Sequence, residues 1–222
     1  MASRIPNRIT IFRVLVHLAA LAPLAVLLWD MWQGNLSVNP IQDITFRTGK
    51  AAMVLLTFSL AATPVVIVFG FKGARQVRRA LGLYAFLYAA LHFLTYAWLD
   101  YGWDLYLIRL EITEKLYVLV GFAAFLILIP LAVTSTKGWQ RRLKKGWIRL
   151  HKLVYAAGVL VMLHYIWVQK ADIRQPLAWT LFLALLLIVR LPPVRRWFTR
   201  RRTRKAVSRR SSRPATKLET SN

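Results

Sequence analysis

The sequence contains no cysteine among its 222 residues. Disulfides, iron–sulfur clusters, thiolate metal ligands and covalent attachment of a prosthetic group through Cys-x-x-Cys-His are therefore excluded. Nucleotide-binding glycine loops and the helical metalloprotease motif are absent as well. Any iron in this chain would be bound by some of its 4 histidines, or less favourably by methionine or tyrosine.

Acidic residues are also scarce, because 8 Asp and Glu stand against 32 Lys and Arg, which gives a net charge of +24. At the same time 57% of the residues are hydrophobic. Long apolar runs joined by short basic loops produce both values, so the composition predicts a multi-pass membrane protein. The positive charge lies beside the apolar runs, which favours membrane lipid over nucleic acid as the partner of the basic residues.

The apolar residues gather into six runs of roughly membrane-spanning length, which predicts an all-α integral membrane protein, a bundle of six transmembrane helices. The runs are 9–29, 51–69, 80–99, 116–134, 150–168 and 177–189. Arg13 and His17 interrupt the first run, which is also long for a secretory signal, so we expect it to be retained. Residues 1–195 are predicted to form the membrane domain, and the basic residues 196–222 a disordered tail.

The connections between these runs alternate in charge. Residues 70–79 and 135–149 contain Lys and Arg but no acid, whereas residues 100–115 contain Asp100, Asp104, Glu111 and Glu114. Because positively charged loops stay on the cytoplasmic side, both termini are predicted to be cytoplasmic.

Two histidines lie at similar depth, nearer the outer face, in runs that cross the membrane in the same direction. They are His92 in the third run and His164 in the fifth. Two imidazoles at one depth on different helices are a suitable ligand pair for haem iron. The alternative is a pair of packing histidines that bond to carbonyls or hydroxyls across the bundle, with Thr95, Tyr96 and Tyr165 as candidate partners.

His151 lies at the cytoplasmic mouth of the fifth run, roughly 20 Å from His164 along a helix. A haem ligand at His151 would need a second ligand, which could be water, an unusual side chain or His17. The alternative is an interfacial histidine hydrated among lipid headgroups. The spacing of His151 and His164 does not complete whole helical turns, so two haems in different gaps and a distortion near Gly158 both remain open.

Arginines flank the runs on both sides of the predicted membrane. Haem propionates reach the interface, where arginine pairs with them in bidentate fashion. Arg78, Arg79 and Arg149 could do this on the inner side, and Arg47 and Arg109 on the outer side. For any single arginine, the alternative is topology control and contact with lipid headgroups.

Two segments carry a resemblance to a known family. RRALGLYAFLYAALHFLTYAWLD (78–100) and LHKLVYAAGVLVMLHYIWVQKAD (150–172) resemble the MsrQ family, formerly YedZ. These are the haem-binding membrane subunits of the periplasmic protein-methionine-sulfoxide reductase system. NPIQDITFRTGKAA (39–52) and LAVTSTKGWQRRL (131–143) resemble loops of the same family, and the similarity covers about residues 8–195.

The resemblance implies a six-helix, ferric reductase-like b-type cytochrome of the bacterial inner membrane with one or two haems. Electrons would come from the quinone pool, with quinol as donor, or from a cytoplasmic flavin reductase. They would pass to a periplasmic molybdopterin subunit, the partner in a heterodimer, which reduces methionine sulfoxide in oxidised envelope proteins. By position, His92, His151 and His164 match the family's haem-associated histidines. FMN is also attributed to the family, but the sequence offers no site for it.

The wider ferric reductase-like relatives use two histidines on each of two helices, whereas the third run here has only His92. A self-contained oxidoreductase of that kind would need a nucleotide-binding domain, which this sequence does not contain. A non-redox transporter with histidines in a proton path is the remaining alternative.

Overall fold

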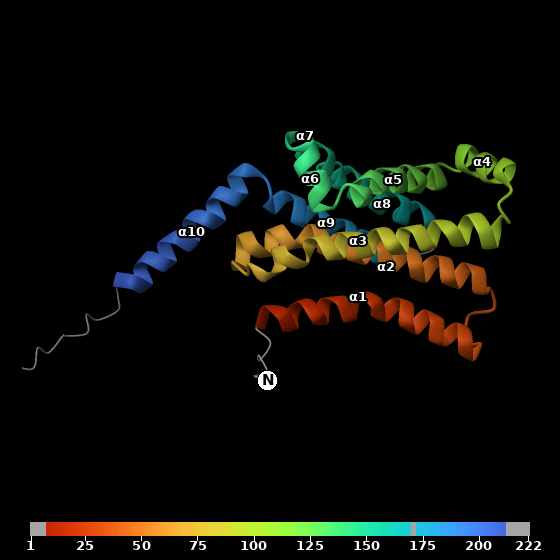
Figure 1. Ribbon diagram of the computed structural model, residues 1–222, viewed down its shortest axis with the longest axis horizontal. Coiled ribbons are helices and arrows are strands. Elements are labelled where there is room, and N and C mark those ends of the chain that lie inside the picture. Colours follow the sequence, from red (N-terminus) through yellow and green to blue (C-terminus); the bar gives the residue numbers. More distant parts are fainter. Residues whose placement is uncertain (1–7, 170–171, 212–222) are drawn as a thin grey trace, which may run out of the picture.

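The computed structural model describes residues 8–169 and 172–211, with side chains up to residue 201, and every regular element in these residues is a helix (Figure 1). The elements are α1 (Arg8–Gln33), α2 (Pro40–Phe69), α3 (Gly73–Leu94), the π-helix η1 (Thr95–Asp100), α4 (Leu105–Glu114), α5 (Leu116–Val133), α6 (Lys137–Leu143), α7 (Lys145–His151), α8 (Leu153–Val168), α9 (Arg174–Val189) and α10 (Pro192–Ser211).

Five stretches of helix among the described residues are long and apolar enough to cross a membrane. They are α1, α2, α3 with η1, α5, and α7 with α8. A sixth span results if α9 and the start of α10, which meet at a bend of 72°, are counted together. α9 alone has 16 residues, about 24 Å, and is shorter than a typical bilayer core. The predicted all-helical, multi-pass architecture is confirmed.

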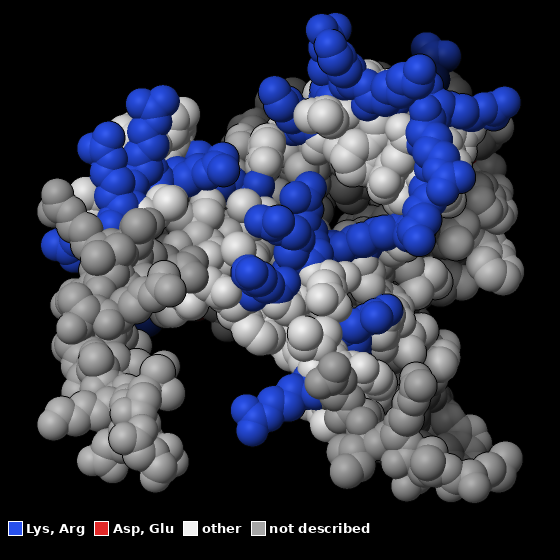
Figure 2. Space-filling model, turned by 60° about the vertical axis from the view of Figure 1, so that its left-hand side comes forward, with Lys and Arg blue, Asp and Glu red and all other residues white. Residues whose placement is uncertain are grey.

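The long helices run back and forth, so alternate connections meet at opposite ends of the bundle (Figure 1). We call the end with the α2–α3 turn, α6 and α7 the basic end, and the end with α4 the acidic end. Figure 2 shows Lys and Arg spread over the basic end, with no acidic side chain in view. The bundle therefore separates the two kinds of connection as the alternating charges require, and the basic end is the predicted cytoplasmic side.

Several segments expected to be loops are helical. α2 begins at Pro40, well before the predicted run 51–69, and the Asn39 side chain caps it by accepting a hydrogen bond from the Gln42 N–H. α4 begins in the same way after Asp104, whose carboxylate accepts bonds from the Tyr106 and Leu107 amides. Three further short or extended helical stretches occupy the expected basic loops, namely α6, α7 and the first turns of α3.

The tail also differs from the expectation. Residues 192–211 form α10, which opens with two prolines, where a missing N–H costs nothing, and continues through helix-favouring arginines. The Arg201 guanidinium lies over the Trp197 ring at 4.1 Å from its centre. Residues 212–222, the rest of the predicted tail, lie outside the described residues.

Tyr88 joins α1 to α3 near the middle of the bundle. Its hydroxyl donates to the Ala20 carbonyl at 2.8 Å and accepts from the Leu24 amide at 2.9 Å, so it stands between two groups of one α1 turn. Pro23 lies in this turn and has no N–H to donate. A side chain inserted beside a proline can open a helical turn. Here the inserted Tyr88 hydroxyl joins α1 to α3.

Arg190, directly after α9, also bonds to a helix that contains a proline. Pro64 of α2 cannot donate to the carbonyl of Leu60, and the Arg190 guanidinium donates to that carbonyl instead. The same guanidinium donates to the Tyr155 hydroxyl at 2.5 Å. One arginine thereby ties α2, α8 and α9 together.

Candidate functional site

His92 and His164 are held in the same way by two different helix pairs. His92 of α3 places Nδ1 at 2.9 Å from the carbonyl of Thr45 in α2. His164 of α8 places Nδ1 at 2.7 Å from the carbonyl of Tyr117 in α5. A carbonyl can only accept, so each Nδ1 carries the hydrogen, and in a neutral imidazole Nε2 then has a free lone pair. In a metal-ligating histidine, a hydrogen bond from the nitrogen that does not bind the metal usually orients the ring. The Nδ1–carbonyl bonds seen here are of that kind.

The two imidazoles meet across the bundle. Their ring centres are 6.2 Å apart and their planes are inclined by 78°. Metal–imidazole bonds are about 2 Å long, so two imidazoles on opposite sides of one metal ion have ring centres roughly 6 Å apart. The expectation of equal depth is confirmed. The hydrogen-bond partners are backbone carbonyls, not the side chains of Thr95, Tyr96 or Tyr165 that the packing alternative suggested.

Aromatic residues and one unpaired hydroxyl lie near this pair along the helices. Phe93 packs on Phe125 and Phe122 with ring centres 5.0 Å and 5.8 Å apart, and the Tyr117 ring centre lies 6.5 Å from that of His164. The Tyr96 hydroxyl, one helical turn beyond His92, is buried and has no hydrogen-bond partner among the described residues. A buried hydroxyl of this kind is suited to a group that accepts a hydrogen bond.

His151 is built differently. The Thr134 hydroxyl donates its one hydrogen to the Pro130 carbonyl at 2.6 Å, so at 3.1 Å it accepts from His151 Nε2. The Trp147 ring stacks on the imidazole at 4.0 Å, and its Nε1 donates to the Thr134 carbonyl at 2.9 Å. His151 ends α7, and the helix break falls at Lys152, so the distortion proposed near Gly158 is not where the structure places it.

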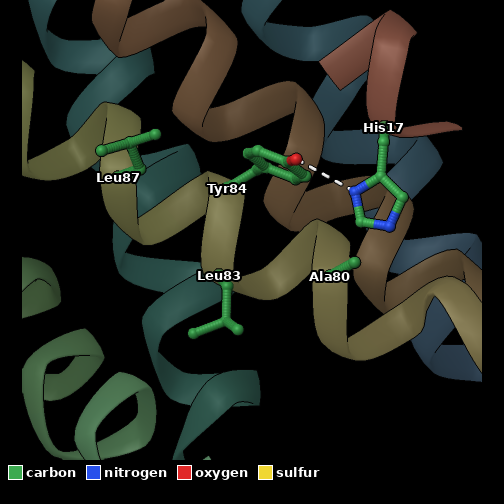
Figure 3. A pocket seen from close by; sticks show the side chains of 5 residues that line it. All are labelled: His17, Ala80, Leu83, Tyr84 and Leu87. Atoms are coloured by element: carbon green, nitrogen blue, oxygen red, sulfur yellow. Dashed lines mark hydrogen bonds between the residues drawn. The ribbon is translucent and has the colours of Figure 1, made fainter. Parts of the chain in front are cut away.

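His17 is paired with Tyr84 and is not brought to His151. Its Nδ1 lies 3.0 Å from the Tyr84 hydroxyl. Both side chains line a shallow, open pocket of about 300 Å³ between α1 and α3, whose other lining residues are Ala80, Leu83 and Leu87 (Figure 3). The pocket thus combines an apolar lining with one imidazole and one phenol.

Two of the arginines predicted for the inner side, Arg78 and Arg79, lie at the basic end. Arg78 is half-buried, and its backbone carbonyl accepts from the Ser59 hydroxyl at 2.9 Å, whereas Arg79 is exposed. Neither guanidinium takes part in an ion pair within the described part of the chain. Arg190 was missed by sequence reasoning. The available signals were a single arginine directly after the sixth apolar run and a proline within a facing helix.

The acidic end contains charges that largely neutralise one another. Arg47 pairs with Asp43 at 2.8 Å and with Asp30. Glu111 pairs with Lys115 at 2.6 Å, and this hydrogen bond raises the pKa of Lys115. Burial and the neighbouring Glu111 carboxylate raise the pKa of Tyr101 to about 12.

No cluster of three or more His, Asp or Glu that could hold a metal ion occurs in residues 8–169 and 172–211. The His92–His164 pair is consequently the arrangement best suited to bind a metal from two sides. A planar group around that metal would supply the remaining ligands.

Comparison with known proteins gives a consistent result. Residues 48–163 match the family model of the ferric reductase like transmembrane component. The chain is 47% identical over 178 residues to the protein-methionine-sulfoxide reductase heme-binding subunit MsrQ of Xanthomonas campestris pv. campestris (strain 8004), covering 78% of this chain and 82% of that protein. It is 44% identical over 207 residues to the MsrQ subunit of Rhodospirillum rubrum, covering 93% of this chain and 98% of the relative.

No solved structure matches the chain. The helical bundle, the apolar spans and the extent of these similarities nevertheless agree along nearly the whole sequence. The chain belongs to the MsrQ family of haem-binding subunits, multi-pass membrane proteins within the ferric reductase-like group.

Proposed function

We propose that this chain is a b-type cytochrome of the bacterial inner membrane, which passes electrons to a periplasmic methionine-sulfoxide reductase. The observation that carries the proposal is the His92–His164 pair, with ring centres 6.2 Å apart and both Nδ1 atoms bonded to carbonyls. The relatives named above are haem-binding subunits of such a reductase. The two imidazoles and the distance between their ring centres suit a histidine pair that would hold one haem iron.

In this proposal His92 and His164 hold the iron through Nε2. The haem would supply a metal centre that accepts and releases one electron at a time. The carbonyls of Thr45 and Tyr117 fix the orientation of the rings, and their hydrogen bonds make the imidazoles better donors. The buried Tyr96 hydroxyl, which has no partner among the described residues, could donate a hydrogen bond to the bound group.

An aromatic cluster begins at the residue that follows His92 in the chain. Phe93 packs against Phe122 and Phe125. An apolar, solvent-poor shell of this kind is one of the features by which a protein sets the reduction potential of a haem.

Electrons would enter from the quinone pool or from a cytoplasmic flavin reductase. The pocket at His17 and Tyr84 supports quinol, because its apolar walls suit a lipid-soluble molecule while the imidazole and phenol can bond to hydroxyl or carbonyl oxygens. We assign no residues to FMN. His17→Gln should slow reduction of the haem by a quinol analogue and leave reduction by dithionite unchanged. An unchanged quinol rate, with rapid reduction by NADH and a flavin reductase, would assign entry to the cytoplasmic side.

Electrons would leave at the acidic end, where the connections are short and can bind a protein surface but cannot enclose a catalytic pocket. We therefore place catalysis in a periplasmic molybdopterin subunit. The test is a reduced-minus-oxidised spectrum with haem quantitation, followed by anaerobic reoxidation. Reoxidation should be fast with the periplasmic reductase and methionine sulfoxide, and much slower with the sulfoxide alone. A fast reaction without the partner would make this chain the reductase itself, and a protein that binds no haem would favour the transporter alternative.

A further inference from the structure

Each imidazole of the pair lies directly against a glycine of the neighbouring helix. A Cβ added to Gly49 of α2 would lie 3.0 Å from His92 Nδ1 and 3.1 Å from Cε1. A Cβ added to Gly121 of α5 would lie 2.7 Å from His164 Nδ1 and 2.8 Å from Cε1. At both positions the three nearest atoms belong to the histidine ring alone. The space that a side chain would occupy is taken by the imidazole.

The arrangement occurs twice, with the same spacing along the chain. In both helix pairs 47 residues separate the histidine from the residue whose carbonyl accepts its Nδ1–H. In both, the glycine follows that carbonyl residue by one helical turn, so carbonyl and glycine lie on the same helix face. One constant offset relates Thr45 to Tyr117, Gly49 to Gly121, and His92 to His164. The two helix pairs thus supply equivalent halves of one site.

Within each half, the two contacts control different things. The carbonyl fixes the direction in which Nδ1 points, and so the direction of Nε2 on the other side of the ring. The glycine fixes how closely the ring approaches the neighbouring helix, and so how far Nε2 reaches toward the opposite histidine. An ordinary small residue at a membrane helix interface lets two backbones approach, whereas these two glycines accommodate a ring.

We propose that Gly49 and Gly121 are positioning residues that set the separation and tilt of the two axial imidazoles. The inference rests on the proposed function, since it concerns the residues that hold the haem. An added methyl group would push the imidazole away from the helix and displace Nε2, so that this histidine would hold the haem less tightly although the ligand is still present. The affinity for haem and the spin state of the iron both respond to that displacement.

The two positions should differ in severity. At Gly49 the nearest contact of 3.0 Å requires the ring to yield by a few tenths of an ångström, whereas 2.7 Å at Gly121 forces a larger shift. We expect Gly121→Ala to lower haem affinity about 10-fold to 100-fold, the usual range for a residue that orients a metal ligand. Gly49→Ala should retain haem, with a smaller loss of affinity and a visible high-spin fraction.

Gly158→Ala is the matched control. Gly158 lies on α8 with His164, and an added Cβ there would lie 3.1 Å from Leu60 Cδ1, which is a comparable crowding against an aliphatic side chain. It should lower thermal stability while leaving the absorption and electron paramagnetic resonance spectra of the haem unchanged.

The experiment measures haem titration, both spectra and thermal unfolding for the three glycine variants beside His92→Ala and His164→Ala. The inference is supported if both Gly121→Ala and Gly49→Ala change the spectra, Gly121→Ala the more strongly, and Gly158→Ala does not. It is overturned if Gly49→Ala has the wild-type spectrum and affinity, or if Gly158→Ala alters them as strongly, and this holds even if Gly121→Ala does not fold. Full haem content in both histidine variants would instead overturn the ligand assignment of the proposed function.

Discussion

The outer and inner histidines of this bundle use opposite ring nitrogens for their hydrogen bonds. At the outer level His92 and His164 bond through Nδ1 to backbone carbonyls, and their ring centres lie 6.2 Å apart. At the inner level His151 uses Nε2 for the Thr134 hydroxyl and is covered by an indole ring. The position that corresponds to His151, by the offset that relates His92 to His164, is occupied by Arg79, which is exposed. The internal repeat is complete at the acidic end and incomplete at the basic end.

This difference separates side chains suited to bind a cofactor, at the outer level, from side chains that stabilise the bundle, at the inner level. The outer level offers two ring nitrogens that have no hydrogen-bond partner among the described residues. The inner level instead consists of polar groups that satisfy each other and the backbone, such as Thr134 with Pro130 and Arg190 with Leu60. We therefore expect outer substitutions to change the cofactor, and inner substitutions to change stability first.

The largest expected effect concerns the outer pair. His92→Ala and His164→Ala should each abolish or severely reduce binding of the outer haem, because one axial ligand and its orienting carbonyl bond are lost together. His151→Ala should leave the spectrum of that haem unchanged. Haem content per protein and the reduced-minus-oxidised spectrum measure this, and equal haem loss in all three variants would contradict the separation of the two levels.

A second prediction concerns the support at the basic end. Arg190→Met should lower the free energy of unfolding by about 1–3 kcal/mol, because the Leu60 carbonyl is left without a donor. In a Pro64→Ala background the same change should cost less, since the introduced alanine provides the missing N–H. A double-mutant cycle on thermal or detergent unfolding measures the coupling. Additive effects would show that Arg190 does not compensate for the proline, and exposed Arg196→Met serves as the control.

The apolar runs and the depth of the histidines were predictable because both follow from composition and from the fixed rise of a helix. The helices α4, α6 and α7 were not, since they are short and polar and their caps resemble turn signals. The contacts of Tyr88 and Arg190 could not be predicted either. In each contact a side chain bonds to backbone groups near a proline of a helix far away in sequence. Such a contact depends on how the two helices pack together.

The site shows the same division. The pairing of His92 and His164 follows from depth alone, but Gly49 and Gly121 have meaning only once the neighbouring helix is in register. The tautomer of His151 likewise depends on where Thr134 directs its single hydrogen, which no spacing rule specifies.

A third, smaller effect tests the inner level directly. His151→Ala should lower the free energy of unfolding by about 1–2 kcal/mol through loss of the Thr134 bond and the Trp147 stack. His151→Gln keeps a side-chain donor and should recover part of this loss. If both variants are as stable as the parent but lose haem, His151 is a ligand in the bound state and its hydrogen bond gives way to iron.

The smallest effect is expected at the acidic end, where a partner would bind. Asp104 and Glu111 are poor probes of steering, because Asp104 caps α4 and Glu111 pairs with Lys115. Asp100 and Glu114 are exposed and outside the ion pairs of the described residues. Reversing both to lysine should therefore slow haem reoxidation by the periplasmic reductase several-fold at low ionic strength, and added salt should mask the difference.

Asp104→Asn provides the control for this test, because asparagine is an equally good N-cap and only the charge is lost. It should slow the reaction less than the double reversal does, with α4 intact. Because steering acts on the rate of encounter, the variants should differ in the second-order rate constant and converge at saturating partner concentration. A salt-independent loss that persists at saturation would instead mean that the substitutions disturb the electron path from the outer histidines.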